Sequence, residues 1–299
     1  MQSNLCLGTA QFGMNYGVTN KLGKISKKEV GLIIKKALEE NICYFDTATA
    51  YGNSESTIGN QIKNQKAKII TKFATNVNGP FKSEDIEILE LQFKNSLSKL
   101  NTSQIDSYLL HDPKDLKKEN SILLINWLKS LKDRDLVKRI GISIYEEFDL
   151  QGIDLKEIEI IQMPISIYDQ RLLHSQLLKE LLDKNISIHL RSIFLQGLLI
   201  QKATKWPKFL SRSFIDHHFF YEKEVNAQNL SLLDSAISFI KKLNFPELVL
   251  FGVTQLQELD AIIDSWKSKR VLENKINYTN YQWNNINDID PRNWKSKNN

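Results

Sequence analysis

Four polar side chains of this 299-residue chain could together make a proton-transfer site. They are a carboxylate, a phenol, an ammonium group and an imidazole, on Asp46, Tyr51, Lys72 and His111. Apolar runs at 42–45, 69–71 and 105–110 lead directly into the first, third and fourth of these residues, so each of the three lies at the end of a predicted strand. A cation beside a phenol favours the phenolate and so lowers its pKa. The arrangement therefore predicts a general acid of the kind that reduction of a carbonyl group requires.

Eight short apolar runs supply the predicted strands that position these groups. They are residues 5–7, 42–45, 69–72, 105–110, 139–143, 160–163, 186–190 and 248–251. Stretches with apolar residues three and four apart predict helices between most of them. These are residues 27–40, 55–63, 83–100, 121–132, 172–184, 230–243 and 255–266, the first with Ser26 as N-cap and Glu29 completing a capping box. This alternation favours a (β/α)8 TIM barrel, in which the carboxyl ends of the strands face the active site.

A doubly wound open sheet is the alternative fold. It would be expected to carry a G-x-G-x-x-G fingerprint after its first strand, and the spacing from Gly8 to Gly13 does not match that pattern. No internal repeat or low-complexity linker divides the chain, so one domain over residues 1–299 is predicted. A tail rich in lysine and asparagine begins at about residue 274, and Trp283 and Trp294 could dock it on the surface.

The composition is that of an ordinary globular protein, with 41% hydrophobic residues, 25% charged residues and a formal net charge of +5. Charges of both signs are mixed along the chain, so no nucleic-acid-binding stripe is predicted. No apolar run reaches the roughly 20 residues that span a bilayer, and no charged and apolar leader precedes the first strand. Cys6 and Cys43 lie in apolar runs and are predicted to be small buried hydrophobes. These features predict a cytoplasmic protein without nucleic-acid or membrane partners.

A long connection over residues 198–229 interrupts the alternation of strands and helices. Long loops in compact barrels usually cover a functional site. The aromatic residues of this connection could instead only pack the loop against the body of the protein. Its basic residues point to a polar or anionic substrate, and they are Lys202, Lys205, Lys208 and Arg212. His217 and His218 are adjacent, without the spacing of a helical ligand pair, so no metal site is predicted.

Four segments of the chain, taken together, resemble the aldo-keto reductase family. They read LGTAQFG at 7–13, FDTATAYGNSE at 45–55, ITKF at 70–73 and DSYLLH at 106–111. Any one of these motifs alone would be weak, and their combination is specific. The resemblance implies a (β/α)8 barrel and the reduction of an aldehyde or ketone with NADPH or NADH as cofactor.

The resemblance also implies a catalytic tetrad of Asp46, Tyr51, Lys72 and His111. Tyr51 would protonate the carbonyl oxygen as hydride reaches the carbon, and Lys72 would favour ionisation of the phenol. Asp46 would keep Lys72 charged and oriented. His111 would orient the carbonyl group through a hydrogen bond.

A cofactor site follows from the same resemblance, made of residues at or just after strand ends. They are Gly8, Thr9, Asp46, Ser143, Gln162, Arg191, Ser192, Gly197, Leu198, Gly252, Thr254, Gln255 and Glu258. Ser143 and Gln162 would hold the nicotinamide carboxamide, and Gly197 and Leu198 would lie near the pyrophosphate. Residues 252–255 lead into the last predicted helix, whose N-terminus would face a 2'-phosphate.

Several positions depart from the family's pattern. Ile144 replaces an asparagine, and Arg191 stands where an aromatic residue commonly stacks on the nicotinamide. The Arg191 guanidinium could stack there too, or receive an anionic group of substrate or cofactor. Residues 254–261 contain no arginine or lysine, and Glu258 and Asp260 add negative charge. NADPH is therefore the family's default and NADH stays open, with a preference below about a hundredfold predicted.

Two interpretations from other functional classes remain. A barrel lyase could form a Schiff base on Lys72, although its charged neighbour Asp46 argues against a neutral, nucleophilic amine. A non-catalytic nucleotide-binding or regulatory subunit could keep the fold without turnover, although the complete set of four residues argues against that loss.

Overall fold

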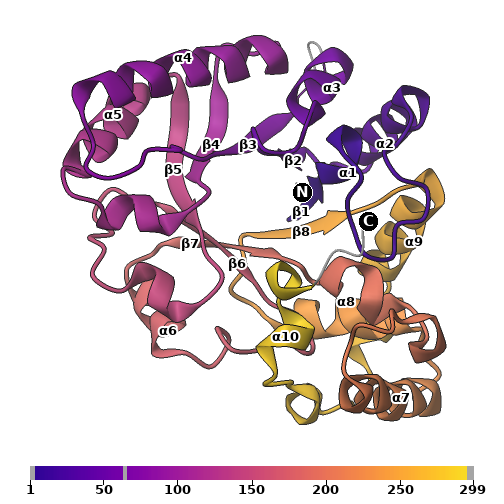
Figure 1. Ribbon diagram of the computed structural model, residues 1–299. Coiled ribbons are helices and arrows are strands. Elements are labelled where there is room, and N and C mark those ends of the chain that lie inside the picture. Colours follow the sequence, from indigo (N-terminus) through magenta and orange to yellow (C-terminus); the bar gives the residue numbers. More distant parts are fainter. Residues whose placement is uncertain (1–3, 63–65, 295–299) are drawn as a thin grey trace.

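Eight parallel strands form a closed barrel in the computed structural model, which describes residues 4–62 and 66–294 (Figure 1). The strands are β1 (Leu5–Gly8), β2 (Tyr44–Asp46), β3 (Lys68–Phe73), β4 (Ile105–Leu110), β5 (Val137–Ser143), β6 (Ile160–Pro164), β7 (Ser187–Arg191) and β8 (Leu248–Gly252). Each strand pairs with the next along the chain, and β8 pairs with β1. The predicted TIM barrel is confirmed, and the open sheet is excluded because the strand order closes on itself.

Most of the helices surround the barrel, whereas α10 borders the carboxyl ends of β6 and β7 (Figure 1). The helices are α1 (Ala10–Gly13), α2 (Lys27–Glu39), α3 (Ser54–Gln61), α4 (Ser83–Leu100), α5 (Ile122–Asp133), α6 (Gln176–Asp183), α7 (Arg212–Ala227), α8 (Leu232–Lys242), α9 (Leu256–Lys267) and α10 (Ile286–Ile289). The predicted helices from 172 and 230 begin later, because the Ser175 hydroxyl accepts a hydrogen bond from Leu178 and that of Ser231 from Asp234. Such N-caps satisfy backbone N–H groups that a helix start leaves free.

The long connection over 198–229 is largely helical, which corrects the prediction of a loop. Its second half is α7, whose cap Ser211 accepts a hydrogen bond from the N–H of Phe214. The buried residues of α7 are Phe214, His218, Tyr221 and Val225, spaced three and four apart. Such spacing is a helical signal. The aromatic residues of this segment are predicted to pack a loop against the barrel, whereas their spacing of three and four residues is that of a helix.

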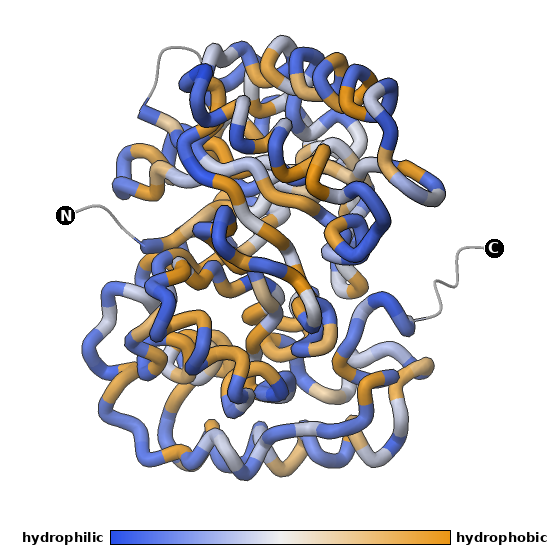
Figure 2. Tube along the Cα trace, turned by 90° about the vertical axis from the view of Figure 1, so that its left-hand side faces the viewer, coloured by the Kyte–Doolittle hydropathy of each residue, from blue (hydrophilic) through white to orange (hydrophobic). Residues whose placement is uncertain are grey.

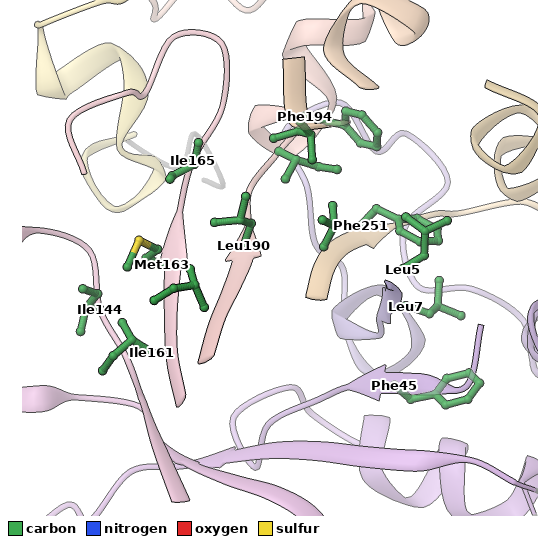
Figure 3. Packing of buried hydrophobic residues seen from close by; sticks show 14 of the residues in the cluster. Leu5, Leu7, Phe45, Ile144, Ile161, Met163, Ile165, Leu190, Phe194 and Phe251 are labelled. Carbon is green, nitrogen blue, oxygen red and sulfur yellow. The ribbon is translucent and has the colours of Figure 1, made fainter. Parts of the chain in front are cut away.

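The core has two layers on either side of the strands. Alternate strand residues point into the barrel and form a small inner cluster of Cys6, Tyr44, Ile70, Leu109, Ile160, Leu248 and Leu250. The opposite strand faces pack against the helices, as Leu5, Phe45, Ile161 and Leu190 do in Figure 3. Figure 2 shows the helices at the outside of the molecule with alternating hydrophobic and hydrophilic positions along the chain. Cys6 is buried as predicted, Cys43 is partly exposed, and both are free thiols.

The C-terminal part of the described chain packs onto the α7 region. The N–H of Trp283 donates to the carbonyl oxygen of Tyr168 at 2.9 Å, and its ring stacks on Phe214. Asp288 accepts hydrogen bonds from Trp283 and Ser211. Within residues 4–62 and 66–294, no helix is long and apolar enough to cross a membrane.

Gly13 has no room for a side chain, and its neighbour is the segment that carries Tyr51. A Cβ atom on Gly13 would lie 1.8 Å from the Tyr51 carbonyl oxygen and 2.4 Å from the N atom of Ser54. Because these are backbone atoms, they cannot move aside without displacing the segment. We expect Gly13→Ala to lower the free energy of unfolding by about 1–3 kcal/mol, as overpacking does, which urea denaturation followed by circular dichroism would measure.

Gly31 in α2 offers a matched control. A Cβ atom there would meet only the end of the Gln61 side chain, at 3.1 Å. Ala also has the higher helix propensity, so we expect Gly31→Ala to change stability by no more than about 1 kcal/mol. Equal urea midpoints for the two variants would contradict the proposed close packing at Gly13.

Candidate active site

A buried ion pair lies at the centre of the candidate site. Asp46 is the last residue of β2 and Lys72 is the penultimate residue of β3. The Lys72 Nζ atom lies 2.5 Å from Asp46 Oδ1, with side chains only 2% and 6% exposed. Because the carboxylate compensates the charge, Lys72 is an anchored ammonium group, which disfavours the Schiff-base interpretation.

Tyr51 and His111 complete the group of four. The Lys72 Nζ atom is 5.3 Å from the centroid of the Tyr51 ring. The His111 ring meets the Tyr51 ring edge-on, with 6.2 Å between centroids. The backbone N–H of His111, directly after β4, donates to the carbonyl oxygen of Phe73. The structure thus brings together all four residues that the sequence selects, and their catalytic roles stay a prediction.

The phenol of Tyr51 is held in its protonated form. Burial raises its pKa, the charge of Asp46 raises it further, and Arg191 acts in the opposite direction. The sequence argument expects a lowered pKa, and the structure corrects it for the free protein. The main physical reason is burial, which removes the phenolate from water, and the negative charge of Asp46 adds to it. A protonated phenol at neutral pH is the form that can donate a proton.

His111 is neutral at neutral pH. Burial is the main cause that lowers its pKa to about 4, and the charges of Lys72 and Arg191 lower it as well. A neutral imidazole keeps one N–H donor and one acceptor nitrogen. His111 can therefore donate a hydrogen bond without adding a third positive charge to the site.

Gln162 in β6 carries an unused hydrogen-bonding atom inside the barrel mouth. Its Nε2 atom donates to Asp46 Oδ2 at 2.8 Å. Its Oε1 atom is buried and has no partner among the described residues. Ser143, at the end of β5, pairs in register with Gln162. The N–H group of an amide in a bound molecule could donate a hydrogen bond to this oxygen. The nicotinamide carboxamide, predicted to bind at Ser143 and Gln162, carries such a group.

The remaining predicted cofactor residues lie at other strand ends. Thr9, after β1, is fully buried, and its hydroxyl donates to the carbonyl oxygen of Asp46 at 2.8 Å. It therefore braces the turn after β2 rather than facing open space. Gly8 and Gly252 are paired in register at the ends of β1 and β8. Leu198 is fully buried.

The segment after β1 closes over the segment after β7, a contact that the sequence analysis misses. The Thr19 hydroxyl donates to the Gln196 carbonyl oxygen, and the N–H of Val18 donates to Gln196 Oε1. Gly197 has a φ of +91°, and a Cβ atom on it would lie 2.2 Å from the Thr19 hydroxyl oxygen. Only the unusual length of the connection after the first strand marks this feature in the sequence.

Carboxylates occupy the N-terminus of α9, where a 2'-phosphate is predicted to bind. Glu258 accepts hydrogen bonds from the N–H and the hydroxyl group of Thr254, at 2.6 and 3.1 Å. Glu29 accepts one from the N–H of Leu256 at 2.7 Å. Ser26 does cap α2, but Glu29 points to α9, so the expected capping box is wrong. The tertiary structure brings Glu29 to α9 from 227 residues away. Gln255 is the N-cap of α9 and makes no side-chain capping bond.

Two tyrosines that the sequence analysis misses border the site. The Tyr16 ring lies 6.4 Å from that of Tyr51, and its side chain is partly open to solvent, with 37% of its surface exposed. Tyr145 follows β5 and packs against Arg191, the last residue of β7. Neither lies in a motif with a sequence signal. No group of three or more His, Cys, Asp or Glu side chains in the described parts of the chain could hold a metal ion.

A family model for the aldo/keto reductase family matches residues 4–284. This chain belongs to the aldo/keto reductase family. An aldo-keto reductase of Bacillus subtilis, YhdN, is 27% identical over 246 residues, which cover 78% of this chain and 70% of that protein. A D-arabinose 1-dehydrogenase of Saccharomyces cerevisiae is 24% identical over 259 residues, covering 79% and 76% of the two chains.

Solved structures agree on the aldo-keto reductase fold. The holo form of an aldo-keto reductase from Bacillus halodurans superimposes with a TM-score of 0.70 at 21% identity, over 90% of this chain and 88% of that one. A glycerol dehydrogenase from Gluconobacter oxydans gives 0.68 at 20% identity, over 89% and 87%. The family and the fold identify this aldo-keto reductase as an oxidoreductase.

The buried ion pair generates a prediction about stability. We expect Lys72→Met to lower the free energy of unfolding by about 3–5 kcal/mol, because it leaves the Asp46 carboxylate buried without a counter-charge. The double variant Lys72→Met, Asp46→Asn removes both charges and should be more stable than the single variant. Denaturant unfolding of the three proteins measures the difference, and a double variant no more stable than Lys72→Met would contradict the pairing.

Proposed function

We propose that this aldo-keto reductase reduces an aldehyde or ketone to an alcohol with NAD(P)H, and that Tyr51 is the proton donor. The observation that carries the proposal is a protonated, half-buried phenol beside the Lys72 ammonium group and the neutral His111 imidazole. The bound nicotinamide would supply a hydride to the carbonyl carbon. Gln162, with its unpartnered Oε1, and the neighbouring Ser143 would hold the carboxamide.

Each residue has a separate role in proton transfer. His111 would donate a hydrogen bond to the carbonyl oxygen and so fix its position near the Tyr51 hydroxyl. Tyr51 would give its proton to that oxygen as negative charge develops there. Lys72 would stabilise the phenolate that remains, and Asp46 would hold Lys72 in place. Lys72 would thus stabilise Tyr51 after the proton has left, and it need not lower the pKa of the phenol in the resting protein.

The substrate is proposed to be a polar carbonyl compound. The name of the yeast relative, D-arabinose 1-dehydrogenase, refers to a sugar, which supports this class. The lysines of the connection after β7 support it less than the sequence alone indicates, because Lys202, Lys205 and Lys208 are exposed. A panel of polar aldehydes and ketones, with oxidation of NADH and NADPH followed at 340 nm, would separate an enzyme from a non-catalytic subunit of the same fold.

Removing the Tyr51 hydroxyl tests the proton donor. We expect Tyr51→Phe to lower kcat by roughly two to four orders of magnitude, the range typical of a general acid, with little change in affinity for NADH. Lys72→Met should be similarly inactive. Stopped assays give kcat, and quenching of protein fluorescence gives the cofactor affinity. Retention of most activity by Tyr51→Phe would overturn the assignment.

The acidic start of α9 governs the choice of cofactor. We propose that Glu258 and Glu29 disfavour the 2'-phosphate, so that NADPH is preferred over NADH by less than about a hundredfold, or not at all. Fluorescence titration with both reduced cofactors at one ionic strength measures the ratio. Glu29→Gln, Glu258→Gln should shift it toward NADPH by about tenfold.

A preference for NADPH of roughly a thousandfold or more would contradict this proposal. It would require a basic residue to reach the phosphate from elsewhere. Lys267 and Arg270 lie at and just beyond the end of α9, but Lys267 pairs with Glu40 at 2.5 Å and Arg270 donates to the Asn229 carbonyl oxygen at 2.7 Å.

A further inference from the structure

Arg191 is a half-buried cation at the mouth of the barrel that is held only by neutral groups. Its Nη2 atom donates to the carbonyl oxygen of Ile144 at 2.8 Å, and its Nη1 atom contacts the Ser192 hydroxyl at 3.3 Å. The guanidinium lies over the Tyr145 ring, 4.0 Å from its centroid. These contacts fix the position of the charge without neutralising it.

Most other arginines of the described chain pair with carboxylates. Those that do are Arg134, Arg139, Arg171, Arg212 and Arg292. Arg270 has no such pair either, but its side chain is exposed to solvent and donates to the carbonyl oxygen of Asn229. The contrast is sharpest on Tyr145, because Arg292 covers this ring too, 3.7 Å from its centroid, and binds Asp290 at 2.6 Å. Among the residues that the structure describes, Arg191 has no carboxylate within ion-pair distance.

The nearby acids are already committed to other partners. Asp46 binds Lys72 and Gln162, Asp169 binds Arg171, and Asp290 binds Arg292. Glu146 lies 3.9 Å from Arg292. A half-buried guanidinium without a counter-charge gains most from an anion brought by a ligand.

Arg191 also lies close enough to the proposed acid to affect it. Its charge lowers the pKa of Tyr51 and of His111. Together with Ser166 and Tyr145 it lines a small hollow at the ends of β6 and β7, and the wall of this hollow also holds Asp169 and Asp290, each bound to another arginine. Arg191 ends β7 at the face of the barrel where Asp46 ends β2, so a molecule that spans the barrel mouth could place its anionic group on Arg191 and its carbonyl group at Tyr51.

We propose that Arg191 binds a carboxylate or phosphate group of the carbonyl substrate and so makes this enzyme selective for anionic aldehydes or ketones. The proposal rests on the carbonyl reduction proposed above, since it names the substrate class of that same site. The planar guanidinium can donate two parallel hydrogen bonds to a carboxylate or a phosphate. The bond to Ile144 and the stack on Tyr145 would keep it oriented for this role.

The test compares substrates that differ only in charge. One pair is 4-carboxybenzaldehyde and its neutral amide 4-formylbenzamide, and the other is glyceraldehyde 3-phosphate and glyceraldehyde. We expect kcat/KM to favour at least one anionic member by about ten- to a hundredfold, and the pair that shows it identifies the anion. Arg191→Gln should abolish the preference by raising KM for the anionic substrate relative to KM for its neutral partner. Arg191→Lys should retain part of it.

Arg292→Gln is the matched control, because it removes a charge from the other face of Tyr145 and should leave the preference intact. Equal use of both members of each pair by the wild type, or a uniform slowing by Arg191→Gln, would overturn the assignment while leaving carbonyl reduction in place. A change in affinity for NADH rather than in KM would instead assign Arg191 to the cofactor.

A binding measurement makes the test independent of turnover. Calorimetric titration with the product 4-(hydroxymethyl)benzoate should show binding to the wild type that Arg191→Gln weakens by about ten- to a hundredfold. If no aldehyde were reduced but this difference persisted, the proposed reaction would fail and the anion site would stand. Equal affinities would overturn the anion site, provided that both proteins unfold at the same temperature.

Discussion

The buried contact between Asp46 and Lys72 is the interaction on which the site depends. It joins β2 to β3 at the barrel mouth, and neither charge would be tolerated there without the other. Gln162 from β6 binds the second oxygen of the same carboxylate, so one acid connects strands on opposite sides of the barrel. The ion pair places a positive charge beside Tyr51, whose pKa is raised mainly by burial and further by the charge of Asp46.

Backbone packing around this pair fixes Tyr51 with little freedom. Thr9 donates to the carbonyl oxygen of Asp46, and the Ser54 hydroxyl donates to that of Thr9. Gly13 lies against the Tyr51 backbone with no room for a methyl group. These contacts are neutral and short-ranged, so they hold Tyr51 in position without changing the charge balance of the site.

Charge at the rim of the barrel is divided between two regions. Arg191, a cation without a paired carboxylate, lies at the end of β7. Beyond β8, Glu258 and Glu29 accept hydrogen bonds from the N–H groups of Thr254 and Leu256 at the start of α9. The proposed selectivity for an anionic substrate depends on the first region, and the proposed tolerance of NADH depends on the second. None of these three side chains is part of the barrel strands' inner core, so they can differ without changing the fold.

The sequence by itself determined the barrel and the four residues of the candidate site. The spacing of apolar residues that indicates a strand or a helix can be found within a short stretch of sequence. Asp46, Lys72 and His111 each follow or end an apolar run. Because the carboxyl ends of parallel strands meet at one face of a barrel, these residues could be placed together. All eight strands lie within two residues of their predicted ranges. Only the tertiary structure decided the reversed pKa shift of Tyr51, the contact of Glu29 with α9 and the isolation of Arg191. Each of these depends on the distances between side chains far apart in the chain, and electrostatic energies follow distance and burial rather than sequence order.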